Sequence, residues 1–163
     1  MKNLYLIGMM GAGKTNIGKM AAQRTHRRFV DTDALIEKHA GMTVAEIFKR
    51  EGESGFRARE TRVLASLARK RNMIVSTGGG IVVTPENIRL MKRSGIVIWL
   101  KRDLHTIIAN PRIRRRPLLA KNENAIFDLM LVREPLYKKA CHFVVYNDAD
   151  RQKTVDEILR IVK

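Results

Sequence analysis

The sequence predicts an α/β protein, a three-layer αβα sandwich around a five-stranded parallel sheet. Five short runs rich in valine and isoleucine are typical of strands, and they lie at 3–8, 28–31, 73–77, 95–100 and 142–147. Several of these runs are apolar almost throughout, as expected for parallel strands that are covered on both faces. Longer helical patterns separate the runs, and this alternation favours a parallel sheet between two helical layers.

Helices are expected between and after these strands, at about 14–25, 32–39, 43–50, 51–70, 85–93, 103–110, 123–139 and 153–162. The longest carries an apolar stripe that includes Phe56, Leu64 and Leu67, with charged residues on its other side. Another begins at "TVAEIF", where Thr43 and Glu46 have the spacing of a capping box. The helical patterns therefore account for most of the chain outside the strands.

The chain is predicted to form one domain, residues 1–163, because its length suits a single well-buried core. Residues 32–72 are too many for a simple crossover between the second and third strands, so we expect a subsidiary helical lobe there. The stretch 107–124 has two prolines, four arginines and little periodicity, which is typical of a mobile loop. No repeat or linker divides the chain.

Composition indicates an ordinary globular protein, with 45% hydrophobic and 29% charged residues. No run approaches the roughly 20 apolar residues of a membrane-spanning helix, and the apolar start is interpreted as a buried first strand rather than a leader. The single cysteine, Cys141, excludes an internal disulfide and fits a reducing cytoplasm. We interpret it as an apolar residue entering the last strand rather than as a nucleophile.

The net charge of +16 is unusual for a small enzyme. It is compatible with a nucleic-acid partner or with a site for polyanionic substrates. The aromatic residues lie mostly inside apolar runs, so platforms on which bases could stack are not evident. We therefore do not expect nucleic-acid binding to be the main function, and the excess of positive charge has no explanation at this stage.

A phosphate-binding motif joins the first strand to the first helix. Gly8 is followed after four residues by Gly13, Lys14 and Thr15. Glycines let several backbone N–H groups approach phosphate oxygens, and the start of the helix adds its positive end. Lys14 can reach the β- and γ-phosphates, and the Thr15 hydroxyl can bind Mg²⁺. The residues expected to bind ATP here are Gly11, Ala12, Gly13, Lys14, Thr15 and Asn16.

Two further motifs follow predicted strands. In "VDTD" the side chains of Asp31 and Asp33 point to one side of an extended segment, at the sheet edge where ligands bind. One could support Mg²⁺ through water and the other could bind a substrate hydroxyl or take its proton; alternatively, one of them caps the next helix. In "STGGG", residues 76–80, three consecutive glycines indicate a close approach to a ligand.

Scattered arginines complete the candidate site. Arg57 and Glu60 are three residues apart on one helix face in "GFRARE", while Arg116 lies in "RRPLL" and Arg133 in "REPLY". A guanidinium suits a carboxylate or a phosphate, although any one of these arginines could simply be a solvated side chain. Together with the other motifs they favour a site for a ligand that bears a carboxylate or phosphate.

At this point the chain resembles the shikimate kinases over nearly its whole length. "GMMGAGKT", "VDTDALIE", "TVAEIFKREGESGFRARE", "VSTGGGIV", "RPLL" and "REPLYKKA" occur in the family's order and approximate spacing. The resemblance implies a P-loop kinase fold, a substrate-binding region at 32–72 and a mobile lid at 110–123. It also implies transfer of the γ-phosphoryl group of MgATP to the 3-hydroxyl of shikimate, a step of chorismate and aromatic amino-acid biosynthesis.

The resemblance also implies individual roles. Lys14 would hold the phosphates, Thr15 the Mg²⁺, and Asp31 would support the metal through water. Asp33 would bind ring hydroxyls and orient or deprotonate the attacking one. The substrate would further be bound by Arg57, Glu60, Gly78, Gly79, Gly80 and Arg133. Arg116 would reach over the phosphates from the lid, and Arg112 is our prediction for the adenine side.

Two alternatives stay open from the sequence alone. A kinase of another acidic polyol, such as gluconate, would share the phosphate loop, although the arginines and "TGGG" argue against it. A basic nucleotide-binding or RNA-binding protein that retains the loop would have no use for an acceptor site. The chain departs from the family pattern at Asn16 and at the proline in "NPRIRRRP". We expect a cytoplasmic monomer.

Overall fold

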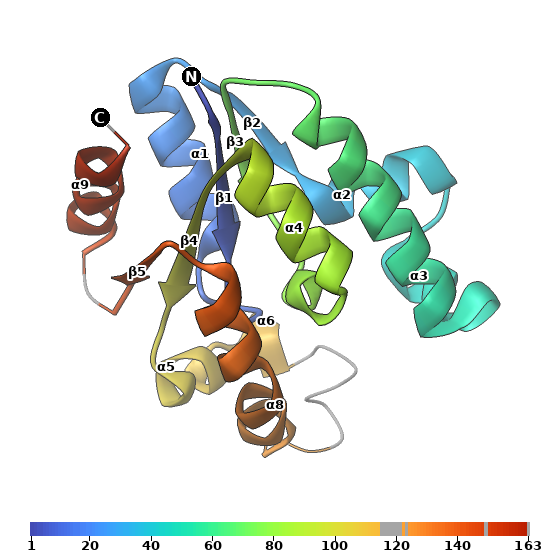
Figure 1. The fold of residues 1–163 in the computed structure, drawn as a ribbon. Coiled ribbons are helices and arrows are strands. Elements are labelled where there is room, and N and C mark those ends of the chain that lie inside the picture. The colour runs from blue at the N-terminus through green and yellow to red at the C-terminus, as the bar shows by residue number, and fades with distance from the viewer. Residues whose placement is uncertain (115–121, 123, 149, 163) are drawn as a thin grey trace.

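The computed structural model describes residues 1–114, 122, 124–148 and 150–162. Five strands form one parallel sheet in the order β2-β3-β1-β4-β5 (Figure 1). Their bounds are β1 Asn3–Ile7, β2 Arg28–Asp31, β3 Met73–Ser76, β4 Gly95–Lys101 and β5 Phe143–Tyr146. Each predicted strand is confirmed to within two residues at either end, and the predicted three-layer architecture is confirmed as well.

The described helices are α1 Lys14–Thr25, α2 Thr32–Ala40, α3 Val44–Ala68, α4 Pro85–Ser94, α5 Leu104–Ala109, α6 Pro111–Arg114, α8 Ala125–Ala140 and α9 Arg151–Ile161. The two helices expected at 43–50 and 51–70 are joined as α3 across a kink at Gly52, whose φ of 69° is non-helical. The capping box is confirmed: the hydroxyl of Thr43 accepts from the amide of Glu46 at 3.2 Å, and the Glu46 carboxylate accepts from the amide of Thr43 at 2.7 Å.

The structure contains two short elements that the sequence did not predict. A 3₁₀ turn, η1 (Ile81–Val83), follows the glycine triplet. In the stretch 107–124, which we expected to lack regular structure, α6 forms at 111–114. Proline is well tolerated in the first turn of a helix, and the Asn110 side chain accepts a hydrogen bond from the Arg112 amide at 3.0 Å. These local effects explain why α6 begins where a proline suggested a break.

The sheet is covered on both faces because its strands carry apolar side chains on both sides. Leu4 and Leu6 of β1 pack with α1 and α9, whereas Tyr5 and Ile7 pack with α3, α4 and α8. All five β1 residues are buried. Figure 1 shows α1 and α9 on one side of the sheet and α4 and α8 on the other.

The carboxyl ends of the strands meet at one edge of the sheet. The phosphate-binding loop follows β1, the "DTD" segment follows β2, and the "TGGG" segment follows β3, and these three strands are neighbours in the sheet. α2 and α3 follow the edge strand β2 and pack against each other. This topology places the three motifs side by side although they are far apart in the sequence.

Candidate active site

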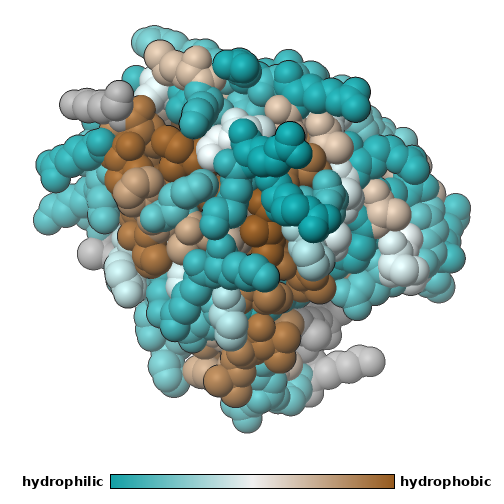
Figure 2. All heavy atoms as spheres, in the orientation of Figure 1, coloured by the Kyte–Doolittle hydropathy of each residue, from teal (hydrophilic) through white to brown (hydrophobic). Residues whose placement is uncertain are grey.

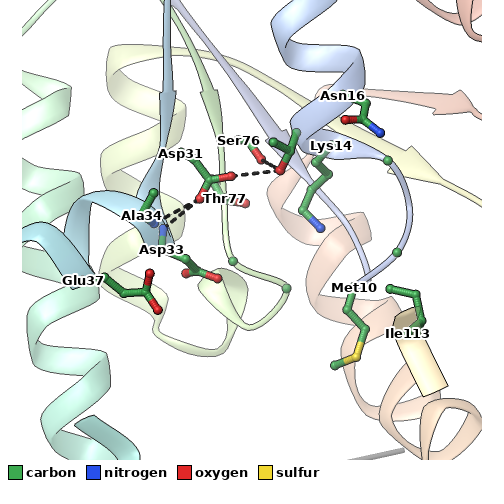
Figure 3. Close-up of a pocket in the computed structure, with 15 residues that line it drawn as sticks. Met10, Lys14, Asn16, Asp31, Asp33, Ala34, Glu37, Ser76, Thr77 and Ile113 are labelled. Carbon is green, nitrogen blue, oxygen red and sulfur yellow. Dashed lines mark hydrogen bonds between the residues drawn. The ribbon is translucent and has the colours of Figure 1, made fainter. Parts of the chain in front are cut away.

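A cleft of about 440 Å³ lies at the carboxyl ends of β1, β2 and β3 (Figure 3). Most of the residues that the sequence predicts for nucleotide, metal and substrate lie in its wall, namely Gly11, Gly13, Lys14, Thr15, Asn16, Asp31, Asp33, Gly78 and Gly79. Six further lining residues, which sequence reasoning missed, are Met10, Ala34, Glu37, Ser76, Thr77 and Ile113. The fold therefore assembles the predicted motifs into one site.

The loop between β1 and α1 has the backbone that the phosphate motif requires. Gly8, Gly11 and Gly13 have φ values of 140°, 76° and 97°, which side chains rarely allow. The Lys14 side chain is nearly buried, and its ammonium donates to the carbonyls of Gly8 at 2.7 Å and Met9 at 2.8 Å. These contacts hold the lysine across the loop, facing the cleft in Figure 3.

Asn147, directly after β5, fixes this loop from the other side. Its buried side-chain amide donates to the carbonyl of Ala12 at 2.8 Å and accepts from the Thr154 hydroxyl at 3.2 Å. A Cβ atom at Gly13 would overlap this amide, so the glycine provides space as well as its backbone angle. The signal for Asn147 in the sequence is only a polar residue at the end of an apolar strand, which sequence reasoning did not use.

Three oxygen-bearing side chains gather where β2 and β3 end. The Thr15 hydroxyl donates to Asp31 Oδ2 at 2.9 Å and lies 3.3 Å from Ser76 Oγ. Figure 3 shows Asp31 and Ser76 next to each other at this point. Asp31 and Ser76 are paired residues of neighbouring strands. Hydroxyl and carboxylate oxygens are ligands of the kind that Mg²⁺ prefers, so this set fits the metal that accompanies a nucleoside triphosphate.

Asp31 also caps α2. Its Oδ1 atom accepts hydrogen bonds from the amides of Asp33 at 3.1 Å and Ala34 at 3.3 Å. The capping role that the sequence left open therefore belongs to Asp31, and its second oxygen still faces Thr15. Asp33 lies in the first turn of the helix, and its side chain lines the cleft.

The glycine triplet provides room for charged side chains. A Cβ atom at Gly78 would lie 2.7 Å from Asp33 Oδ1, and one at Gly79 would lie 3.2 Å from Arg133 Nη1. A Cβ atom at Gly80 would overlap the guanidinium of Arg57, with 2.8 Å to its central carbon. Each glycine thus faces one of the side chains that the sequence assigned to substrate binding, and a larger residue at Gly78 or Gly80 would displace that side chain.

Glu60 positions Arg57. Its carboxylate is fully buried and accepts a hydrogen bond from Arg57 Nη1 at 2.9 Å. Burial raises the pKa of Glu60, while Arg57 acts in the opposite direction; the nearby charge of Asp33 adds to the rise and that of Arg133 reduces it. Its Oε2 atom has no hydrogen-bond partner among the described protein groups. A Cβ atom at Gly78 would lie 3.3 Å from this Oε2 atom, so the second carboxylate oxygen of Glu60 faces the glycine triplet.

Tyr137 was not predicted, although it follows Arg133 by one helical turn in α8. Its buried hydroxyl donates to the carbonyl of Gly79 at 2.6 Å, and its ring stacks on Trp99 with centroids 5.5 Å apart. Burial raises the pKa of Tyr137 to about 12, with Arg133 acting against the rise. Tyr137 therefore remains a neutral donor that fixes the glycine segment.

The predicted arginines of the segment 110–123 are not part of the described cleft wall. Arg112 is exposed on α6, and its neighbour Ile113 lines the cleft instead. Arg116 and most of the predicted lid lie outside the described residues. Within the described ranges, no group of three or more His, Cys, Asp or Glu side chains could hold a metal ion, and no helix is long and apolar enough to cross a membrane.

The two walls of the cleft differ in chemistry. One is a glycine loop with a lysine and a helix start, which is suited to a triphosphate. The other carries Asp33, Gly78 and Gly79. Arg57 and Arg133 approach the glycine triplet beside it without lining the described cleft, and these charged side chains are suited to hydroxyl and carboxylate groups. The arrangement can hold a phosphate donor and an acidic acceptor against each other.

Comparisons with known proteins agree with this chemistry. A family model described as shikimate kinase matches residues 10–163. The shikimate kinase of Caldanaerobacter subterraneus subsp. tengcongensis is 40% identical, with 98% of this chain and 95% of the relative covered. The shikimate kinase of Pelotomaculum thermopropionicum is 42% identical, with 100% of this chain and 96% of the relative covered. The structure of shikimate kinase from Acinetobacter baumannii in complex with shikimate matches with a TM-score of 0.92 at 36% identity, covering 99% of this chain and 93% of that one.

Proposed function

The chain belongs to the shikimate kinase family, and on this premise we propose that it transfers the γ-phosphoryl group of MgATP to the 3-hydroxyl of shikimate. The products are 3-phosphoshikimate and ADP, a step toward chorismate and the aromatic amino acids. The observation that carries the proposal is the wall opposite the phosphate loop, where Gly78, Gly79 and Gly80 each make room for one charged side chain. A carboxylated ring with several hydroxyls matches this wall.

The residue roles are argued from chemistry. Phosphoryl transfer depends mainly on alignment and on neutralisation of charge, because the protein forms no covalent bond. The loop amides and Lys14 bind the phosphates, and Lys14 exchanges its carbonyl partners Gly8 and Met9 for phosphate oxygens when ATP enters. Asp33 orients the attacking hydroxyl and accepts its proton.

The acceptor is held by its carboxylate. Arg57 and Arg133 approach the glycine triplet from two different helices, α3 and α8, and guanidinium groups bind carboxylates with two parallel hydrogen bonds. Glu60 does not react; it fixes the direction of Arg57. Residues 32–72, which form α2 and α3, would contribute to the side of the site that binds the acceptor. Arg116, in the predicted lid segment 110–123, would reach the phosphates of ATP.

Mg²⁺ is the proposed cofactor. It would neutralise charge on the β- and γ-phosphates, and the Thr15 hydroxyl would bind it, with Asp31 acting through a water molecule. The support is the Thr15–Asp31–Ser76 oxygen set at the end of β2 and β3. A cytoplasmic location and a monomeric state remain predictions, which rest on the single cysteine and on a chain length suited to one domain.

The decisive experiment is a coupled ADP-release assay with a panel of acceptors. We expect turnover with shikimate and none with gluconate or nucleoside monophosphates. Turnover that depends on gluconate instead would favour the first alternative. ADP release that depends on none of the acceptors would overturn the proposal and leave nucleotide binding alone, the second alternative.

A further inference from the structure

The segments that lead into the five strands lie at the amino-terminal edge of the sheet, opposite to the candidate active site (Figure 1). These segments are residues 1–3, 24–28, 69–72, 92–95 and 138–142, and together we call them the basic edge. They contain no aspartate or glutamate. Their lysines and arginines are Lys2, Arg24, Arg27, Arg28, Arg69, Lys70, Arg71, Lys92, Arg93, Lys138 and Lys139.

Direct contacts show that these segments lie side by side. The Arg27 guanidinium donates to the carbonyl of Lys2, and the amide of Asn72 donates to the carbonyl of Met1 at 3.1 Å. The first three segments therefore meet at β1, β2 and β3. Apart from Arg27, which is mostly buried, every lysine and arginine of the basic edge is exposed.

The other two segments extend this edge. The Lys92 ammonium donates to the carbonyl of Lys139 at 3.1 Å, which links the segments before β4 and β5. The pKa of His142, the last residue of the segment before β5, is lowered by burial and further by the positive charges of Lys92 and Lys2. The cations thus form one continuous surface across all five strands rather than isolated side chains.

A groove of about 590 Å³ lies within the basic edge, between the ends of α3 and α4. Its charged lining residues are Lys2, Arg69, Lys70, Arg71 and Arg93, and no carboxylate lines it. In Figure 2 the corresponding upper margin of the molecule is mostly hydrophilic. The groove is a concave place where several cations can converge on one anionic group.

Little of this charge is neutralised within the protein. Among the described residues, only two cations of the basic edge form salt bridges, Arg24 with Asp156 at 2.6 Å and Lys138 with Glu134 at 3.4 Å. The carboxylates Asp31 and Asp33 lie instead at the opposite edge. Eleven of the 32 lysines and arginines of the chain therefore lie on this one edge, whose five segments carry no carboxylate.

We propose that the basic edge binds the phosphate backbone of double-stranded nucleic acid, without preference for a base sequence. Five strands about 4.8 Å apart give the edge a width of roughly 20 Å. A duplex carries one phosphate charge per roughly 1.7 Å of its axis, so an extended polyanion matches the whole array, whereas a single small anion would occupy only part of it. The basic edge would recognise only the negative charge of the phosphate backbone, which DNA and RNA duplexes share.

Other polyanionic partners fit less well. The basic edge contains no phenylalanine, tyrosine or tryptophan, so it offers no platform for the stacked bases of a single strand. It also lacks the aromatic and leucine side chains with which membrane-surface helices enter lipid. Protein interfaces have charge-depleted, apolar cores, and the only exposed large apolar side chain of these segments is Met1.

The test measures binding of fluorescent 20-base-pair DNA and RNA duplexes by anisotropy, at salt concentrations from about 50 to 300 mM. The variant Arg69→Ala/Arg71→Ala/Arg93→Ala removes three groove cations. The matched control Lys38→Ala/Lys49→Ala/Arg50→Ala removes three exposed cations from α2 and α3. Each contact contributes about 0.9 to the slope of log Kd against log salt, so the groove variant should lose roughly 2 to 3 from this slope and at least about tenfold in affinity at 100 mM salt.

Thermal stability should be unchanged in both variants, and the Arg→Lys version of the groove variant should retain duplex binding. Saturating MgATP and shikimate should not displace the duplex, because the active site lies at the other edge. The proposal is overturned by any of four results: no duplex binding at 50 mM salt, equal losses in both variants, displacement by MgATP, or tighter binding to phosphatidylserine vesicles than to the duplex.

Discussion

Arg57 donates a hydrogen bond from Nη1 to Oε1 of Glu60 at 2.9 Å, and the carboxylate that receives it is fully buried. The bond fixes a guanidinium that directly abuts Gly80, where a Cβ atom would overlap it. The exposed carboxylate of Glu53 lies farther from Arg57, at 3.4 Å. The direction of Arg57 is therefore set mainly by the buried carboxylate of Glu60. A change in either residue should affect binding at the proposed substrate site.

Glu60→Gln should raise the KM for shikimate about tenfold and change kcat less than about threefold. The amide keeps an acceptor for Arg57 but removes the charge, and a charge-assisted hydrogen bond is roughly twice as strong as a neutral one. A tenfold change corresponds to about 1.4 kcal/mol. Steady-state kinetics with saturating MgATP measure the effect. Glu53→Gln is the control, and an equal increase in KM there would contradict the special role of Glu60.

The same residue predicts a pH dependence of stability. Because the pKa of Glu60 is raised in the folded protein, the folded state holds this proton more tightly than the unfolded chain does. The contribution to stability is fully present below the ordinary pKa of a glutamate and is lost as the pH rises through the raised pKa. The free energy of unfolding of the unchanged protein, relative to Glu60→Gln, should therefore fall as the pH rises across this window. Urea titrations measure this difference, and a constant difference would show that folding does not raise the pKa.

Gly78→Ala should lower kcat/KM for shikimate at least about a hundredfold while ATP binding stays within about twofold. The added Cβ atom would meet Asp33 Oδ1 at 2.7 Å, and misplacement of a positioning group by about 1 Å can cost that much. Gly41→Ala is the control, since a Cβ atom there meets nothing within 4 Å although its φ of 66° is strained. It should lose stability, by roughly 1–2 kcal/mol, but not activity. If both variants lost activity, lower stability rather than displacement of Asp33 would explain the result for Gly78→Ala.

Asp33→Asn should abolish most phosphoryl transfer and leave ATP affinity within about twofold. General-base catalysis contributes about 10²- to 10⁴-fold, and the amide cannot accept the proton. The coupled assay and a nucleotide titration measure the two quantities separately. Glu37→Gln offers a matched control, because Glu37 lines the same cleft and its hydrogen bond from the Val44 amide can be kept by the glutamine. Full activity of Asp33→Asn would exclude the proposed role.

Thr15→Val should raise the Mg²⁺ concentration for half-maximal activity at least about tenfold, whereas Thr15→Ser should restore the normal requirement. Valine has a similar shape but no hydroxyl to bind the metal or to donate to Asp31 at 2.9 Å. Activity is titrated against free Mg²⁺ at a fixed ATP concentration. An unchanged requirement in Thr15→Val would show that the metal does not depend on this hydroxyl.

Strands, helices and motifs were predictable because each has a local signal. Apolar runs of β-branched residues marked the five strands, and Gly8 through Thr15 identified the phosphate loop from its spacing alone. The capping box at Thr43 was equally local. In contrast, α6 was missed because its start depends on the side chain of Asn110, which the apolar pattern does not reveal.

The sequence by itself determined the fold class, the phosphate loop and the family, since these follow from patterns within short segments and from their order. Only the tertiary structure decided which residues meet: Asn147 against the loop at Gly13, and Tyr137 on the carbonyl of Gly79. It also showed that five basic segments, scattered over the chain, form one edge of the sheet. The physical reason is the parallel topology, which gathers every strand end with its neighbours regardless of separation in the sequence.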